Sequence, residues 1–137
     1  MIILDTSFIV GYKIENDAHR ENATKMIKEI ADLKYGRPVI SDYIFDETVT
    51  VVFSRSKNLQ LSIEIGNDLK NSVEVIKIDD LLFEETWKIF ESQKGTRFSF
   101  TDCTTLALMK NRNISNIATF DEDFGKMKQI NVIKEPK

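Results

Sequence analysis

Short runs of hydrophobic residues alternate along this chain with longer stretches in which hydrophobic residues recur every three or four positions. The short runs predict buried strands, and the longer stretches predict amphipathic helices. The expected strands are Met1–Leu4, Val39–Ile40, Val73–Ile78, Ile117–Thr119 and Ile130–Ile133. The expected helices are Ser7–Tyr12, His19–Leu33, Asp42–Ser54, Leu59–Leu69, Leu81–Ser92 and Thr101–Asn113, with a further helical turn at Phe124–Met127.

This alternation predicts an α/β fold in which a central parallel sheet of four or five short strands lies between layers of helices. Internal repeats, low-complexity tracts and linkers rich in Pro, Gly or Ser are absent from the sequence, which has 5 glycines and 2 prolines. We therefore expect the 137 residues to form one domain, spanning residues 1–137.

Composition narrows the class of protein. Hydrophobic residues make up 42% and charged residues 30%, as in an ordinary globular protein. The single cysteine, Cys103, excludes an internal disulfide and is expected to be a buried side chain in a reducing cytoplasm. No apolar stretch is long enough for a membrane span, and Asp5 interrupts the first apolar run, so neither a membrane segment nor a signal peptide is expected.

The formal net charge is −3, which argues against a protein that coats nucleic acid through bulk positive charge. It does not argue against a nuclease, because a metal ion held by acidic residues supplies the positive charge that a phosphate needs.

Two aspartates directly follow expected strands. Asp5 ends the first strand and Asp121 follows the strand near Ile117–Thr119. Side chains just past the carboxyl ends of parallel strands line the crevice in which ligands bind. The alternative is that each aspartate only caps the next helix. Asp102, at the start of another helix, has the same alternative, because Ser99 precedes it with the spacing of a capping box.

Glu47 lies in the expected helix Asp42–Ser54, at the border of its buried face, because Ile44 and Val51 flank it at i−3 and i+4. Asp46 is expected to point toward solvent. A carboxylate at the edge of a core is costly unless it is paired or holds a cation. The alternatives for Glu47 are therefore a metal ion or a Lys or Arg partner at the rim.

Taken together, the four carboxylates are expected to project near one edge of the sheet. Converging carboxylates repel one another, and hard divalent cations such as Mg²⁺ or Mn²⁺ relieve that repulsion through oxygen ligands. Nearby hydroxyl groups are candidates for orienting the carboxylates: Thr6, Ser7, Thr101 and Thr119. One histidine and one cysteine, far apart in the chain, argue against a zinc site.

Five segments resemble the PIN-domain family, and within it the VapC-like toxin ribonucleases of toxin–antitoxin pairs. They read ILDTSFIV, NDAHRENA, SDYIFDETVT, SFTDCTTLALM and IATFDEDFGKM, and they span the chain from its first residues to the last strand. The resemblance implies a PIN-like three-layer fold, and it implies metal ligands at Asp5, Glu47, Asp102 and Asp121, with Asp123 as a replacement or helper. One departure is the polar run Cys103–Thr105, where the family often has small residues.

The resemblance implies metal-dependent hydrolysis of RNA phosphodiester bonds, with Mg²⁺ or Mn²⁺ as the cofactor. We expect the RNA to be bound through single-stranded or loop segments. Candidate phosphate contacts are Lys94, Arg97, Arg55 and Lys57. The alternative for each of them is an ordinary solubilising charge.

The resemblance also implies a small antitoxin partner and self-association into homodimers. Helices His19–Leu33 and Asp42–Ser54 are candidate docking surfaces, unless their apolar faces are ordinary core. His19 is expected to start a helix rather than to act as a catalyst. Leu82, Trp87 and Phe90 recur at helical spacing and are expected in the core.

Two other functions are compatible with these residues. One is a catalytically silent PIN-fold protein that binds RNA or a partner. The other is a phosphotransfer enzyme with Asp5 as nucleophile, although haloacid-dehalogenase-type phosphatases typically carry a second Asp where this chain has Ser7.

Overall fold

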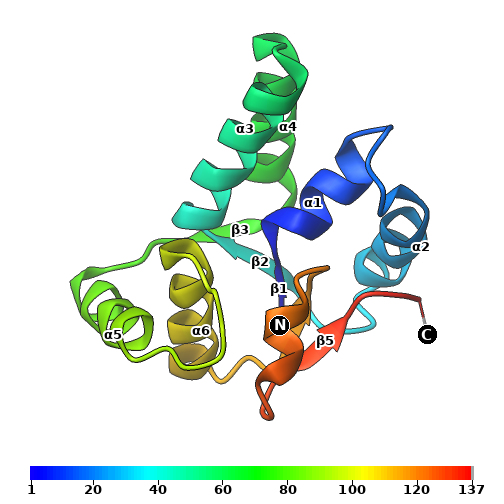
Figure 1. Ribbon diagram of the computed structural model, residues 1–137. Helices are drawn as coiled ribbons and strands as arrows, with labels where there is room; N and C mark the ends of the chain where they lie inside the picture. Colours follow the sequence, from blue (N-terminus) through cyan, green and yellow to red (C-terminus); the bar gives the residue numbers. More distant parts are fainter. Residues whose placement is uncertain (137) are drawn as a thin grey trace.

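The computed structural model describes residues 1–136, which form a five-stranded sheet in the order β3-β2-β1-β4-β5 with every neighbouring pair parallel (Figure 1). The strands are β1 Ile2–Leu4, β2 Pro38–Ser41, β3 Glu74–Ile76, β4 Asn116–Ala118 and β5 Asn131–Ile133. The predicted α/β class is confirmed, and the sheet has the larger of the two expected numbers of strands.

Helices cover both faces of this sheet. They are α1 Thr6–Lys13, α2 Arg20–Ala31, α3 Asp42–Ser56, α4 Leu59–Ser72, α5 Asp80–Glu91 and α6 Phe100–Arg112, and a 3₁₀ helix, η1, spans Glu122–Lys126. Figure 1 shows α1 and α2 on one side, α5 and α6 on the other, and α3 with α4 as a hairpin that stands away from the sheet. Within residues 1–136, no helix has the length and apolar character needed to cross a membrane.

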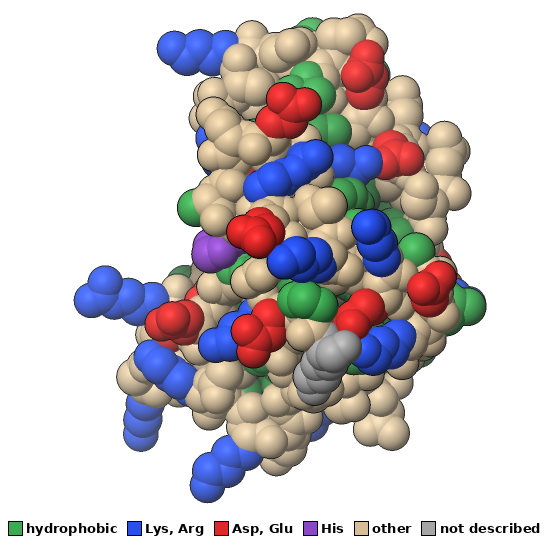
Figure 2. Space-filling model, turned by 90° about the vertical axis from the view of Figure 1, so that its right-hand side faces the viewer, with side chains coloured by type: hydrophobic (Ala, Val, Ile, Leu, Met, Phe, Trp, Pro, Cys, Tyr) green, Lys and Arg blue, Asp and Glu red, His purple; other side chains and the backbone are tan. Residues whose placement is uncertain are grey.

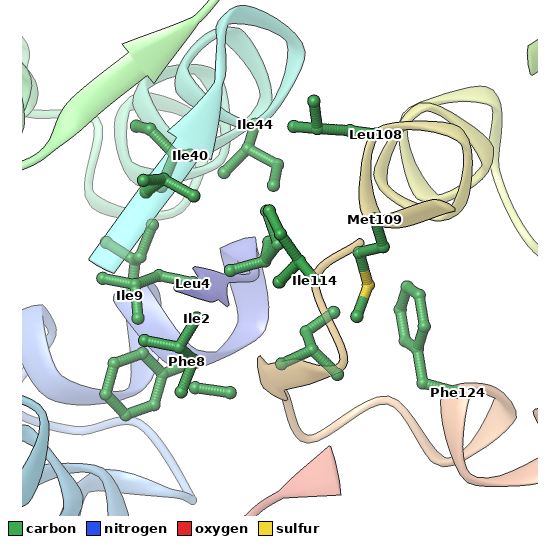
Figure 3. Packing of buried hydrophobic residues seen from close by; sticks show 14 of the residues in the cluster. Ile2, Leu4, Phe8, Ile9, Ile40, Ile44, Leu108, Met109, Ile114 and Phe124 are labelled. Carbon is green, nitrogen blue, oxygen red and sulfur yellow. The ribbon is translucent and has the colours of Figure 1, made fainter. Parts of the chain in front are cut away.

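The core explains why the short apolar runs become strands. Ile2 and Ile3 are fully buried and Leu4 is nearly so, because helices cover both sides of β1. Figure 3 shows Phe8 and Ile9 from α1, Ile44 from α3 and Leu108 from α6 converging around this strand. Full burial of each such side chain contributes about 1.5–3 kcal/mol to folding.

The polar run at the start of α6 fits this core. Cys103, Thr104 and Thr105 are all fully buried, so the expectation for Cys103 is confirmed. The hydroxyl groups of both threonines donate to the backbone carbonyl of Thr101. Because the helix backbone accepts these bonds, the two hydroxyls are buried without losing hydrogen bonds.

The expectation for α5 is only partly right. Leu82 is buried, but Trp87 is 47% and Phe90 is 37% exposed, with their rings stacked at 5.7 Å. Placing the two aromatic residues in the core was wrong. Helical spacing identifies an apolar stripe but does not say which element covers it, and α5 packs chiefly on α6 at the outside of the molecule.

The order of the strands places a crevice beside β1. From β1 the chain builds β2 and β3 on one side, and it then returns to place β4 and β5 on the other. The strand order therefore reverses between β1 and β4. In open parallel sheets, ligands bind at this reversal, outside the carboxyl ends of the strands.

Candidate active site

Asp5 is held at the reversal point between β1 and β4. Its backbone N–H donates to the carbonyl of Ala118 at the end of β4, at 3.0 Å. Asp5 occupies the N-cap position of α1, yet its side chain makes no capping bond. Instead, its Oδ2 accepts hydrogen bonds from Thr119 Oγ1 at 2.6 Å and from Ser7 Oγ at 3.2 Å. The alternative that Asp5 is only a helix cap is therefore wrong for its side chain.

A frame of hydroxyl groups surrounds Asp5. Ser7 Oγ accepts from the N–H of Phe120 at 3.0 Å, and Thr119 Oγ1 accepts from the N–H of Asp121 at 3.0 Å. These bonds tie the residue after β1 to the loop after β4. Behind them, Thr48 of α3 donates from its buried hydroxyl to Thr6 at 3.3 Å.

The structure brings all four predicted carboxylates to one cavity of about 390 Å³. They come from four elements, namely the ends of β1 and β4, the middle of α3 and the start of α6. Thr6 and Ser7 also line the cavity, whereas Thr119 lies behind Asp5, and Thr101 is not among the lining residues.

Two of the carboxylates also cap helices, as the alternatives supposed. Ser99 and Asp102 form a reciprocal capping box, in which Asp102 Oδ2 accepts from the N–H of Ser99 at 3.0 Å. Asp121 accepts from the N–H of Asp123 at 3.0 Å and caps η1. Glu47 is different, because it forms no ion pair within residues 1–136. The expected Lys or Arg partner at the rim is therefore not found there.

Burial, together with neighbouring negative charge, raises the pKa of two acids in this cavity. Burial raises the pKa of Asp5 to about 7; hydrogen bonds from Thr119 and Ser7 lower it, and the charges of Asp102 and Glu47 raise it further. Burial also raises the pKa of Asp102 to about 6, against the Ser99 hydrogen bonds, and the nearby Asp121 and Glu47 carboxylates add to the increase. Both shifts indicate that negative charge is held here at a cost.

The donor set fits a hard divalent cation. Carboxylate oxygens with nearby hydroxyls are the ligands that Mg²⁺ and Mn²⁺ prefer, and a cation would relieve the repulsion between the acids. In the part of the chain that the structure describes, however, no three His, Cys, Asp or Glu side chains already lie close enough to surround one ion. Side-chain rotation would be needed to complete such a site, for which a flexible glutamate such as Glu47 is suited.

Asp123 has another place in the structure. Its Oδ2 accepts from the backbone N–H of Arg97 at 2.8 Å, and its Oδ1 pairs with Lys126 at 2.7 Å. Its Oδ2 thus ties the loop before α6 to η1, whereas its Oδ1 pairs within η1. Asp123 is not among the residues that line the cavity.

Of the four predicted RNA contacts, Arg55 alone lines the cavity among the described residues; Lys57, Lys94 and Arg97 lie outside it. Sequence reasoning did not include Asp17, which also lines the cavity and pairs with Arg55 at 2.9 Å. The sequence signal for Asp17 is weak: an aspartate side chain often accepts from the backbone N–H two residues later, here that of His19, and so forms a local turn. His19 is the N-cap residue of α2, in agreement with its expected place at a helix start, and it also lines the cavity.

Comparison with known proteins adds the family. The PIN domain profile matches residues 2–130. The "23S rRNA-specific endonuclease VapC20" of Mycobacterium tuberculosis is 27% identical over 124 residues, which cover 90% of this chain and 92% of that protein. The crystal structure of M. tuberculosis VapC20, described as a "Sarcin-Ricin loop cleaving toxin", superposes with a TM-score of 0.85 at 25% identity and covers 99% of this chain and 100% of that one. VapBC2 from Rickettsia felis, bound to promoter DNA, has the same fold, with a TM-score of 0.72 at 18% identity over 99% of this chain and 100% of that one.

Proposed function

The chain belongs to the PIN domain family, and from this premise we propose that it is a metal-dependent endoribonuclease, the toxin of a VapBC-type toxin–antitoxin pair. The observation that carries the proposal is the convergence of four carboxylates, from four separate elements, on one cavity at the reversal point of the sheet. The similarity to a 23S rRNA-specific endonuclease supports RNA as the substrate.

In this proposal Asp5, Glu47, Asp102 and Asp121 hold Mg²⁺ or Mn²⁺. When bound, the metal supplies an activated water and stabilises charge on the phosphate and the leaving oxygen. The carboxylate of Asp5 is held in place, because the hydroxyl groups of Thr119 and Ser7 both donate to its Oδ2. Asp102 accepts from the backbone N–H of Ser99 through one oxygen, and a carboxylate has a second oxygen for a ligand.

We propose a structured RNA with an accessible loop as the substrate class. A-form duplex hides its base edges in a deep, narrow groove, whereas loops offer unstacked nucleotides. The cavity is small, so one phosphodiester of a splayed strand fits it better than a duplex. The similarity to VapC20, a toxin that cleaves the sarcin–ricin loop, supports this class. An RNA substrate and a thiol without a disulfide are consistent with action in the cytoplasm.

The antitoxin would cover the groove between α3 and α4. This groove has a volume of about 410 Å³, and its apolar lining includes Phe53, Leu59 and Ile63, which are 44–56% exposed. A solved VapBC complex of the same fold supports a partner of this kind. Of the two helices predicted to dock a partner, α3 contributes to the groove. The apolar face of α2 is ordinary core, since Ala23, Met26 and Ile30 are buried.

For the homodimer we propose the exposed aromatic face of α5. Phe83, Trp87 and Phe90 lie on it, and Phe83 and Phe90 contact the ring of Phe100 at 5.2 and 6.2 Å. Aromatic residues are enriched at the cores of protein interfaces. Burial of this face in a dimer would explain large apolar side chains that the monomer leaves exposed.

The test is cleavage of a structured RNA pool by the purified protein in EDTA, Mg²⁺ or Mn²⁺, with Asp5→Asn beside it. We expect cleavage that needs metal and that falls more than about 100-fold in the variant, because loss of a ligand should exceed the effect typical of outer-sphere changes. Asp46→Asn is the matched control, since Asp46 lies on the exposed side of α3.

Equal rates for Asp5→Asn and the parent protein would contradict the proposal. Absence of cleavage in every metal by folded protein that still binds RNA would favour the silent RNA-binding alternative.

A further inference from the structure

Arg55 lines the acidic cavity. Glu47, Val51 and Arg55 follow one another at four-residue spacing along α3, and all three line the cavity. Glu47 is among the acids, and Arg55 is two helical turns away, about 12 Å along the axis. The helix thus places one positive charge at the rim of the cavity, apart from the four predicted metal ligands.

The guanidinium of Arg55 is held in place by Asp17. Nη1 lies 2.9 Å from Asp17 Oδ2, and the Asp17 side chain is only 10% exposed, whereas that of Arg55 is 45% exposed. The other oxygen of Asp17 accepts from the backbone N–H of His19 at 2.9 Å. The carboxylate is therefore fixed by its own loop, and it fixes the arginine in turn.

The same loop is tied to Asp5. The His19 ring stacks on Phe120 at 4.1 Å with the ring planes 6° apart. Phe120 donates its backbone N–H to Ser7 Oγ, and Ser7 donates its hydroxyl to Asp5. Arg55 and Asp5, which are 50 residues apart in sequence, are thus set relative to each other by a continuous chain of contacts.

Arg55 also has the chemistry that an approaching RNA strand needs. Among the described residues that line the cavity, it is the one with a permanent positive charge. A guanidinium has five N–H donors, so a bond to Asp17 through Nη1 leaves donors for a phosphate. Figure 2 shows acidic and basic side chains interspersed on the face beside α1 and α2, without a broad basic field. On this face no broad positive field surrounds the cavity, and the cavity lining itself carries the charge of Arg55.

We propose that Arg55 binds a backbone phosphate of the RNA next to the scissile one, and that Asp17 is the positioning residue that holds its guanidinium toward the strand. This inference rests on the proposed function, because it takes the acidic cavity as the place where the scissile phosphate binds. It assigns the path of the RNA across the surface, which runs from the four carboxylates toward the C-terminal end of α3.

The chain contains a matched arginine for comparison. Arg37 pairs with Glu74 at 3.0 Å, with side chains 62% and 41% exposed. This pair lies where β2 and β3 begin, at the opposite edge of the sheet from the cavity. Arg37→Gln and Arg55→Gln therefore remove the same group from an ion pair at two different places.

The test measures binding rather than cleavage. A fluorescein-labelled RNA hairpin with a single-stranded loop is titrated with the Asp5→Asn protein in Mg²⁺, followed by anisotropy from about 50 to about 200 mM salt. We expect Arg55→Gln to weaken binding about tenfold, in line with loss of a charged hydrogen bond. Loss of one phosphate contact should also reduce the slope of log affinity against log salt by about 0.7. Arg37→Gln should change neither, and Arg55→Lys should restore the salt slope.

Equal affinity and slope for the Arg55→Gln and Arg37→Gln proteins would overturn the inference, as would absence of binding by all of them. A thermal melt of Arg55→Gln separates loss of contact from loss of fold, and Arg55→Met, which also removes the charge, repeats the test if the melt has shifted. The readout does not depend on cleavage. If the protein with Asp5 intact cleaves no RNA while Arg55→Gln still weakens binding, the proposed nuclease fails and the phosphate contact stands.

Discussion

At the amino edge of the sheet, Arg37 pairs with Glu74 at 3.0 Å, and Asn131 donates to Asn116 at 2.9 Å across the starts of β4 and β5. At the carboxyl edge of the same strands, four carboxylates share one cavity. Polar groups at the first edge are matched with partners, whereas like charges are gathered at the second. Folding alone favours the first arrangement, because it satisfies polar groups without repulsion. The second arrangement costs stability and indicates a site built for a ligand.

The largest expected effect is on the stability of the metal-free protein as the pH rises. The folded-state pKa of Asp5 is about 7, above its ordinary value of 3.8. A carboxyl group whose pKa is raised in the fold stabilises the fold while it is protonated, and this contribution is lost as pH rises from about 4 through 7. For Asp5 the loss amounts to at most about 4 kcal/mol.

We therefore expect the free energy of unfolding in EDTA, from urea titrations, to be higher at pH 5 than at pH 8. Asp5→Asn should remove most of this difference, and Mg²⁺ should raise the stability of the parent protein at pH 8. Glu74→Gln at the amino edge should leave the pH dependence unchanged. A flat profile for the parent protein in EDTA would show that the fold does not raise the pKa of Asp5.

The second expected effect is a difference in RNA cleavage rate between variants at the carboxyl edge and variants at the amino edge of the sheet. Glu47→Gln replaces an acid of the cavity with a neutral side chain of the same size, and Glu74→Gln does the same at the amino edge. We expect the first to lower single-turnover RNA cleavage more than about 100-fold, because a metal ligand is lost. The second should stay within about twofold of the parent protein, as befits an exposed ion pair. Similar rates for the two variants would remove Glu47 from the site.

Much of this contrast could be predicted from the sequence. The strands were predicted to within a few residues, because a run such as Ile2–Leu4 must be buried on both faces. Asp5 and Glu47 could be identified because a carboxylate beside apolar residues is costly unless it is paired or holds a cation. The pairing of Arg55 with Asp17 could not be predicted, since it joins residues 38 positions apart through the conformation of a loop. The same holds for the hydrogen bond that Asp123 accepts from the backbone N–H of Arg97, 26 residues away.

The third effect concerns the support of Asp5. Thr119 is fully buried, and its hydroxyl makes the 2.6 Å bond to Asp5. Thr119→Val keeps the shape and removes this bond, so we expect a loss of cleavage of about 10- to 100-fold, the range typical of groups that orient metal ligands. Thr119→Ser should retain most of the rate. Thr50→Val, at an exposed position of α3, is the control. A rate unchanged in Thr119→Val would mean that Asp5 does not need the bond.

The smallest effect is at the amino edge and concerns stability alone. Gly36 has φ +86, a conformation that side chains disfavour, and an added Cβ would lie 2.8 Å from the backbone nitrogen of Met1. We expect Gly36→Ala to lower the free energy of unfolding by about 1–2 kcal/mol. Gly125→Ala, where an added Cβ meets no atom within 4 Å, should change it far less. The cleavage rate per folded molecule should stay unchanged in both, because Gly36 lies at the end of the sheet away from the acids. A loss of rate in folded Gly36→Ala protein would mean that the two edges are coupled rather than independent.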